Sequence, residues 1–405
     1  MYTEVPGGVC AAKGFSASGV HCGIRPNHPK ADLALISADV RCAAAGVYTT
    51  NKVCGAPITV DRLHLQDGYA QAVIVNSGNA NTCAANGVEL ALSVCGLVAD
   101  KLGIQKEDVL PASTGVIGQV LPIEPIITAV PTLVKELDYG KNEEAATAIM
   151  TTDTVKKEYA VEFQLDGKTC RLGGMAKGSG MIHPNMATTL NFISTDCAIS
   201  ADMLQQALRE IVKVTYNCLS IDGDTSTNDM VEIMASGLAG NAEITAPGPA
   251  LDTFKAALYD VMANLTRMLA KDGEGASKLL ECVCSGAPTK DTAIIVAKGV
   301  IGSTLFKCAM FGEDANWGRV LCAIGYAPAE FDIDKVDVAL KSTAGTVTVC
   351  QNGTGVDFSE EEAAKVLAED EIYILVDLNQ GDEKATAWGC DLTYDYVKIN
   401  GDYRT

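Results

Sequence analysis

Residues 177–190 read KGSGMIHPNMATTL, and residues 171–176 just before them read RLGGMA. The two stretches place Gly173, Gly174, Gly178 and Gly180 close to Pro184, in the middle of an otherwise apolar region. Glycine permits backbone angles that other residues resist, and it lets a ligand or another backbone approach closely. The pattern is typical either of a tight loop between two strands or of a reaction centre.

The segments on both sides of this stretch alternate between strand and helix patterns. Residues 158–178 are predicted to form a hairpin with Asp166-Gly167 at its turn, and residues 189–200 are predicted to form the next strand. This mixture favours sheets covered by helices. Further strands are expected at 31–39, 71–80, 292–301, 336–341 and 371–378, and helices at 88–103, 143–150, 201–218 and 252–272.

Length and composition indicate an ordinary globular protein. The chain has 405 residues, of which 48% are hydrophobic and 20% charged, enough for one large α/β unit or two core-forming units. Only the Gly- and Pro-containing stretch 236–252 resembles a linker, and an ordinary surface loop explains it equally well.

Charge and hydropathy exclude some classes of partner. The net charge is −20, which argues against binding to nucleic acid or to an anionic membrane surface, because both need clustered cations. No apolar run approaches the length of a membrane-spanning helix. The first residues carry neither a basic segment followed by an apolar core nor an Arg-rich transit pattern, so we expect no targeting segment.

The fifteen cysteines are scattered singly, apart from Cys282 and Cys284. No CxxC pair occurs, and with four histidines no zinc-ligand spacing appears, so we predict no metal site and no cofactor. Several cysteines lie in apolar runs, for example Cys95 and Cys322. We therefore expect reduced, buried thiols in a reducing compartment, the cytoplasm.

The glycine-rich stretch allows two chemical interpretations. Phosphate binding is disfavoured because neither G-x-x-x-x-G-K-[ST] nor a G-x-G-x-x-G after a strand is present. Catalysis by a threonine hydroxyl needs an adjacent base, and His183 is the one histidine nearby. A threonine at the start of a cut chain would need no histidine, because its own α-amine has a pKa of about 7.7–8.0, but spacing alone does not point to such a cut.

The stretch AKGSGMIHPNMATTL at 176–190 resembles the signature of the ornithine acetyltransferase family, the glutamate N-acetyltransferases of arginine biosynthesis. Thr189 is a small departure, since the family often has a hydrophobic residue there. Other family-like blocks follow in the expected order: NSGNANTC at 76–83, PASTGVIG at 111–118, MTTDT at 150–154, SIDGDTSTND at 220–229, DGEGASK at 272–278, FGEDANWGRVLCAIGY at 311–326 and YVKINGDYRT at 396–405.

The resemblance implies self-cleavage between Ala187 and Thr188. It gives an α chain of residues 1–187 and a β chain of residues 188–405. The sequence does not resolve a domain boundary inside the β chain. The resemblance also implies a layered α/β sandwich of β-sheets covered by helices, similar to N-terminal nucleophile hydrolases but with different connectivity. The two chains are expected to associate as an α2β2 heterotetramer.

The resemblance also assigns the candidate site. It makes Thr188 the nucleophile and gives the oxyanion hole to Thr114 and Gly115, whose hydroxyl and backbone N–H suit developing negative charge. Taken singly, these residues would be an ordinary strand threonine and an ordinary turn. The substrate-binding residues carried over from the family are Thr151, Lys177, Thr188, Glu274, Asn400 and Thr405. The Lys177 cation suits a substrate carboxylate, and the Glu274 carboxylate suits a substrate ammonium group.

The activity implied is transfer of the acetyl group from N2-acetyl-L-ornithine to L-glutamate, giving L-ornithine and N-acetyl-L-glutamate. The reaction would run by ping-pong steps through an acetyl-threonine ester. Some family members also accept acetyl-CoA, and both alternatives stay open. Other hypotheses are a related self-processing amidase or aminopeptidase, and a binding or scaffold protein that has kept the fold.

The sequence leaves two roles in the candidate site open and favours a structural role for one acidic block. Thr151 and Thr152 are equally good candidates to face the substrate. His183 could act as a proton shuttle, although the family motif does not demand histidine there. The acidic block 220–229 lacks the terminal Glu and the loop length of an EF-hand, so a structural turn network is predicted rather than a calcium site.

Overall fold

A computed structural model describes residues 2–25, 29–183 and 189–402. The chain divides into two compact units. The first comprises Met1–Gly178, Asn185–Lys213 and Thr225–Leu265, and the second comprises Ser179–Pro184, Val214–Asp224 and Thr266–Thr405. These units do not coincide with the predicted chains 1–187 and 188–405, because the first unit takes residues from both sides of that bond.

A nine-stranded mixed sheet forms the centre of the first unit. Its order is β1-β6-β7-β8-β10-β3-β4-β5, with β2 pairing to β3. The β8–β10 and β4–β5 pairs are parallel and the others are antiparallel. The strands are β1 Thr3–Glu4, β2 Phe15–Val20, β3 Leu33–Tyr48, β4 Tyr69–Asn79, β5 Val109–Val116, β6 Lys157–Leu165, β7 Lys168–Lys177, β8 Leu190–Thr195 and β10 Met230–Ala235.

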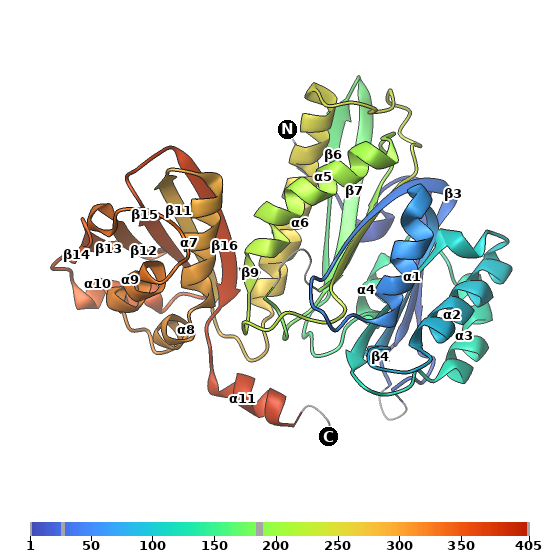
Figure 1. The fold of residues 1–405 in the computed structure, drawn as a ribbon, viewed down its shortest axis with the longest axis horizontal. Coiled ribbons are helices and arrows are strands. Elements are labelled where there is room, and N and C mark those ends of the chain that lie inside the picture. Colours follow the sequence, from blue (N-terminus) through green and yellow to red (C-terminus); the bar gives the residue numbers. More distant parts are fainter. Residues whose placement is uncertain (1, 26–28, 184–188, 403–405) are drawn as a thin grey trace. The chain divides into compact units, whose positions relative to one another are not determined.

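Both faces of this sheet are buried at strands β3 and β4. Leu33 and Leu35 belong to one core cluster, whereas Ala34 and Ile36 belong to the other, as the two-residue period of a strand requires. The first cluster includes residues of α2 (Gly87–Leu102) and α3 (Ile123–Lys135), and the second includes α4 (Asn142–Ala148). Helix α2 contacts β5, whereas α3 and α4 each contact β2 and β3 (Figure 1). The other helices that begin in this unit are α1 Ala56–His64, α5 Ala201–Val214 and α6 Pro249–Lys271.

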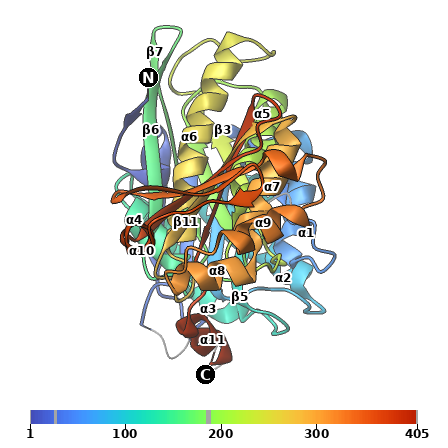
Figure 2. The same ribbon diagram turned by 90° about the vertical axis from the view of Figure 1, so that its left-hand side faces the viewer.

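The second unit is built on a seven-stranded sheet in the order β14-β13-β12-β15-β11-β16-β9. Helix α7 (Lys290–Gly302) packs on β11 and β16 and contacts α8 and α9 (Figure 2). A sheet covered by helices is thus present in each unit. The strands are β9 Leu219–Ser220, β11 Leu279–Ala287, β12 Asp337–Ser342, β13 Gly345–Gln351, β14 Thr354–Gly355, β15 Glu371–Asp377 and β16 Glu383–Cys390, and the other helices are α8 Thr304–Phe311, α9 Trp317–Gly325, α10 Glu360–Leu367 and α11 Tyr394–Gly401.

Most of the predicted elements are confirmed. The hairpin turn falls at Asp166 and Gly167, both with positive φ (51° and 71°) as a tight two-residue turn requires. The strand predicted at 31–39 extends to Tyr48, and the helix predicted at 201–218 ends at Val214. The stretch 236–252 lies wholly within the first unit, so it is not a linker between the units.

The predicted strand at 292–301 is wrong, because these residues belong to α7. Its Ile and Val residues suggested a strand, since β-branched residues are enriched there. Its buried residues Ala293, Val296, Ala297 and Val300 instead follow helical spacing. The side chain of Thr289 caps the helix by accepting the Thr292 N–H.

The cysteines are all free thiols, and most of them are buried, Cys95 included. The expectation of burial is wrong for Cys322, which is exposed on α9. Helical position explains the difference, since neighbouring Val320, Ala323 and Ile324 of α9 take the buried side. Within 2–25, 29–183 and 189–402, no single helix has the length and apolar character needed to cross a membrane, although the bent pair α7–α8 passes by length and composition.

Candidate active site

The two oxyanion-hole candidates, Thr114 and Gly115, lie near the carboxyl end of β5, in a strand rather than in a turn. Gly115 pairs with Gly78 of β4 where the parallel register shifts into a bulge. Its φ is 134°, and a Cβ atom there would lie 2.3 Å from the carbonyl carbon of Gly78. Only glycine suits this position, so the bulge holds the Gly115 backbone in place.

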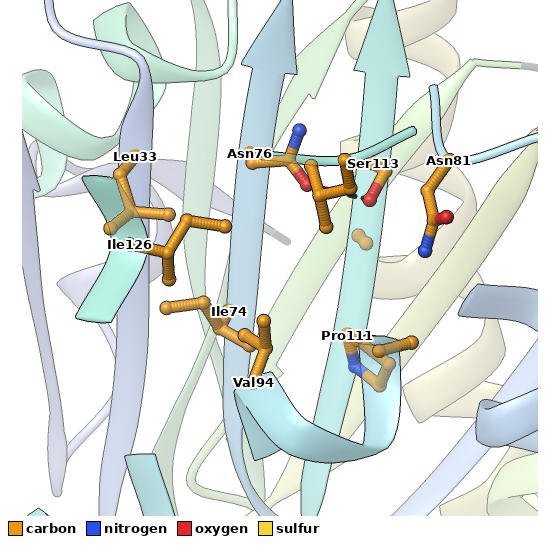
Figure 3. Close-up of a pocket in the computed structure, with 11 residues that line it drawn as sticks. Leu33, Ile74, Asn76, Asn81, Val94, Pro111, Ser113 and Ile126 are labelled. Atoms are coloured by element: carbon orange, nitrogen blue, oxygen red, sulfur yellow. Dashed lines mark hydrogen bonds between the residues drawn. The ribbon is translucent and has the colours of Figure 1, made fainter. Parts of the chain in front are cut away.

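Polar side chains fix the strand ends immediately beside this bulge (Figure 3). Ser113 Oγ donates to Asn76 Oδ1 at 2.6 Å, and Asn76 Nδ2 donates to the Asn79 carbonyl at 2.8 Å. A cavity of about 10 Å³ lies among Ile74, Val94 and these side chains. That space suits roughly one water molecule and is far too small for an amino-acid substrate. It is a packing gap beneath the strand ends.

Lys177, at the end of β7, meets Thr114. Its Nζ lies 3.3 Å from Thr114 Oγ1, although 63 residues separate the two in the chain. Because an ammonium group can only donate, Thr114 accepts this bond and keeps its hydroxyl proton for another acceptor. The structure therefore brings together two of the residues that the sequence placed in the site.

Asp153 ties Thr151 of the MTTDT block to the glycine-rich stretch. One carboxylate oxygen accepts from Lys157 Nζ and from the Gly178 N–H, both at 2.6 Å, and the other accepts from the Thr151 N–H at 3.0 Å. Burial alone would raise the pKa of Asp153, but the charges of Lys177 and Lys157 and these bonds lower it to about 2. Sequence reasoning missed this residue.

Lowering the pH should weaken the interactions of the Asp153 carboxylate within a defined pH range. Since the pKa of Asp153 is depressed from 3.8 to about 2, the stability that its charge supplies is complete above about pH 4 and is lost as pH falls toward 2. The shift corresponds to about 2 kcal/mol. We expect Asp153→Asn to be less stable than wild type at pH 7. As the pH falls from 7 toward 2, the difference in unfolding free energy between the two proteins should shrink by about that amount. Urea denaturation at several pH values measures it, and a constant difference down to pH 2 would contradict it.

Asn228 joins three of the family-like blocks. Its Nδ2 donates to the carbonyls of Ala80 (2.6 Å) and Ser113 (2.9 Å), and its Oδ1 accepts from Thr82 (2.6 Å). Blocks 76–83, 111–118 and 220–229 thus meet at one buried amide. The sequence showed these blocks only as separate matches, and no spacing rule could have joined them.

In the second unit, Glu274 and Asn400 are brought together. Asn400 Nδ2, on α11, donates to Glu274 Oε2 at 2.7 Å. Glu274 is buried, so it is not the solvated surface charge that its residue type would suggest. A Cβ atom on Gly180 would lie 2.3 Å from Glu274 Oε2, which explains this glycine as a site of close approach.

The acidic block contributes Asp222 to the same unit as a turn anchor, as predicted. Its carboxylate accepts the N–H groups of Met181 (2.6 Å) and Ile182 (2.9 Å) and the hydroxyl of Tyr396 (3.2 Å). His183 Nδ1 lies 2.9 Å from Ser220 Oγ. Burial and the charge of Lys298 lower the pKa of His183 to about 4, so its imidazole is neutral at pH 7.

Several of the predicted site residues are not placed. Ala187, Thr188 and Thr405 lie outside the described residues. Thr151 and Thr152 are both half-buried, and Thr151 is held through its backbone by Asp153. The two clusters of placed residues are therefore Thr114, Gly115, Thr151 and Lys177 in the first unit and Glu274 and Asn400 in the second.

Comparison with known proteins gives extended matches. The ArgJ family profile matches residues 16–405. "Arginine biosynthesis bifunctional protein ArgJ" of Caldanaerobacter subterraneus subsp. tengcongensis is 49% identical over 394 residues, covering 97% of each chain. "Arginine biosynthesis bifunctional protein ArgJ 1" of Clostridium acetobutylicum is 49% identical over 392 residues, covering 96% of each.

A solved structure agrees with these matches. The crystal structure of arginine biosynthesis bifunctional protein argJ from Bacillus halodurans aligns with a TM-score of 0.50 and 44% identity, covering 53% of this chain and 99% of that one. The chain is thus an α/β protein whose sheets are covered by helices. The bulge at Gly115 and the profile match agree with one family. The chain belongs to the ArgJ family.

Proposed function

We propose that this chain is a glutamate N-acetyltransferase that moves the acetyl group of N2-acetyl-L-ornithine to L-glutamate in arginine biosynthesis. The observation that carries the proposal is the ArgJ profile match over residues 16–405, with relatives named for arginine biosynthesis at 49% identity. The meeting of Lys177 with Thr114 beside Gly115 supports it structurally.

In the proposed reaction, Thr188 Oγ attacks the acetyl carbon while its proton passes to the Thr188 α-amine. The Thr114 hydroxyl and the Gly115 N–H donate to the oxyanion that forms. The C–N bond of acetylornithine then breaks, and the ornithine nitrogen leaves with that proton. The glutamate amine attacks the resulting ester, which releases N-acetylglutamate and restores the Thr188 hydroxyl.

Charge complementarity supports the substrate class. Lys177 offers a cation for a substrate carboxylate, and Glu274, oriented by Asn400, offers an anion for an ammonium group. Thr151 and Thr405 complete the proposed binding set with neutral donors. We extend the proposal to acetyl-CoA as a second acetyl donor, supported by the word "bifunctional" in the relatives' name.

Self-cleavage between Ala187 and Thr188, an α2β2 assembly and a cytoplasmic location belong to the same proposal. The solved relative's chain spans 53% of this one while being matched over 99% of its own length. Residues 188–405 are 218 of 405, about 54% of the chain, so a β chain made by this cut has a comparable length. This agreement in length supports the cut.

Acetylornithine turnover, followed with and without L-glutamate, tests the activity. We expect ornithine release to depend on glutamate and to match N-acetylglutamate formation mole for mole. Rapid ornithine release with free acetate and no need for glutamate would identify the amidase or aminopeptidase alternative instead. An inert protein would favour the binding or scaffold alternative.

The same assay examines the role of Glu274. Glu274→Gln keeps an acceptor for Asn400 but removes the charge, so acetylornithine use should weaken while thermal stability changes little. Parallel losses of stability and activity would make the residue structural.

A further inference from the structure

Asp229 is a buried acidic residue that the reaction above does not use. It directly precedes β10 and is 2% exposed. Its Oδ1 accepts the Thr189 N–H at 2.7 Å. Its Oδ2 is buried and has no hydrogen bond of good geometry among the residues the structure describes, although Ser226 lies close enough to favour the charged carboxylate. An incompletely satisfied buried carboxyl group costs stability, so a role other than stability accounts for it better.

Thr189 itself has an unusual backbone. Its φ is 75°, in the left-handed region that a β-branched residue rarely adopts. Three contacts hold it: its N–H bonds to Asp229, its carbonyl accepts the Met230 N–H at 2.9 Å, and its Oγ1 accepts from Asn191 Nδ2 at 2.6 Å. A conformation of this kind persists only where the surroundings over-determine it, and such positions cluster at functional sites.

The Asp229 bond acts on the peptide unit that joins Thr189 to the residue before it. Fixing that N–H restricts the backbone of Thr189, the first described residue after the proposed scissile bond. Of the three contacts, this one alone uses a side chain that reaches the Thr189 backbone from outside strand β8 and its neighbour β10. The charge of Lys177 also reaches Asp229, and both residues lie in the first unit.

We propose that Asp229 is a positioning residue for self-cleavage: by accepting the Thr189 N–H, it holds the backbone that follows the scissile bond in its strained conformation. This inference rests on the proposed cut before Thr188. Asp229 touches no reacting atom in this role. It removes conformational freedom from the peptide next to the bond, and misplacement of reacting groups by about 1 Å can cost on the order of 10²-fold in rate.

The test follows the cleavage rate of newly translated full-length chain by intact mass. Asp229→Ala should cleave on the order of 10²-fold more slowly than wild type. Asp229→Asn keeps an oxygen acceptor and should stay within about tenfold of wild type. Glu232→Gln, which alters a buried carboxyl within β10, the strand that follows Asp229, is the matched control and should cleave normally.

A double variant separates positioning from folding. Glycine adopts positive φ without strain, so Thr189→Gly in the Asp229→Ala background should recover part of the lost rate. Far-UV circular dichroism and thermal unfolding confirm that each variant is folded. Equal cleavage rates for wild type and Asp229→Ala would overturn the inference, as would an Asp229→Asn protein as slow as Asp229→Ala. An uncut wild-type chain would instead refute the proposed cleavage itself.

Discussion

Thr188→Ala is expected to purify as one uncut chain of 405 residues, whereas the wild-type protein is expected to yield an α chain ending at Ala187 and a β chain beginning at Thr188. Alanine removes the only atom that can attack the preceding carbonyl, and without the cut no α-amine forms to act as a base. Acetyl transfer should fall on the order of 10⁶-fold, the scale seen when a covalent nucleophile is removed.

Intact mass and N-terminal sequencing of the smaller species measure this result. The matched control is Thr189→Val, which keeps the branched shape but lacks the neighbouring hydroxyl, and it should still be cut before Thr188. A β chain that begins at Thr189 would show that the second threonine is the nucleophile. The pair of variants therefore resolves the register of the MATT sequence.

The second large effect is expected at Thr114. Loss of one oxyanion donor typically lowers turnover by about 10²–10³. Thr114→Ala, studied in protein that has already been cut, should lose activity by that factor while KM changes little, because the hydroxyl acts on the transition state. The Lys177 bond strengthens this expectation, since it leaves the hydroxyl proton of Thr114 for the oxyanion.

Steady-state transfer from acetylornithine to glutamate provides the measurement. Thr114→Ser retains a hydroxyl and is the control, expected to keep most of the activity. Normal turnover in Thr114→Ala would place the oxyanion hole elsewhere. Gly115→Ala is a poor substitute for this test, because its Cβ would lie 2.3 Å from the backbone of Gly78 and would distort the bulge.

Local patterns in the sequence predicted many of the elements correctly. The Asp166-Gly167 hairpin and the helix at 88–103 were readable because their signals lie within a few residues. Helix α7 was misread because its β-branched residues resemble a buried strand, and its cap at Thr289 lies outside the apolar run. The β-branched residues of this segment favour a strand, whereas the spacing of its buried residues favours a helix. Packing of that buried face against the rest of the unit makes the segment a helix.

Contacts across long sequence distances were beyond this kind of reasoning. The resemblance named Lys177 and Thr114, but their meeting depends on where β7 and β5 end. Asp153, Asn228 and Asp229 carried no separate signal, because a single Asp or Asn in a polar stretch usually marks a turn. Their importance appears only when their backbone partners are known.

The strand order of the first unit has a consequence for a chain cut before Thr188. Strands β8 and β10 lie between β7 and β3, so the carboxyl-terminal fragment would supply two interior strands to a sheet begun by the amino-terminal fragment. Each fragment alone would expose unpaired sheet edges that invite aggregation. The two products that the proposed cut would give are thus complementary parts of the sheet of the first unit, and separating them would require unfolding that sheet.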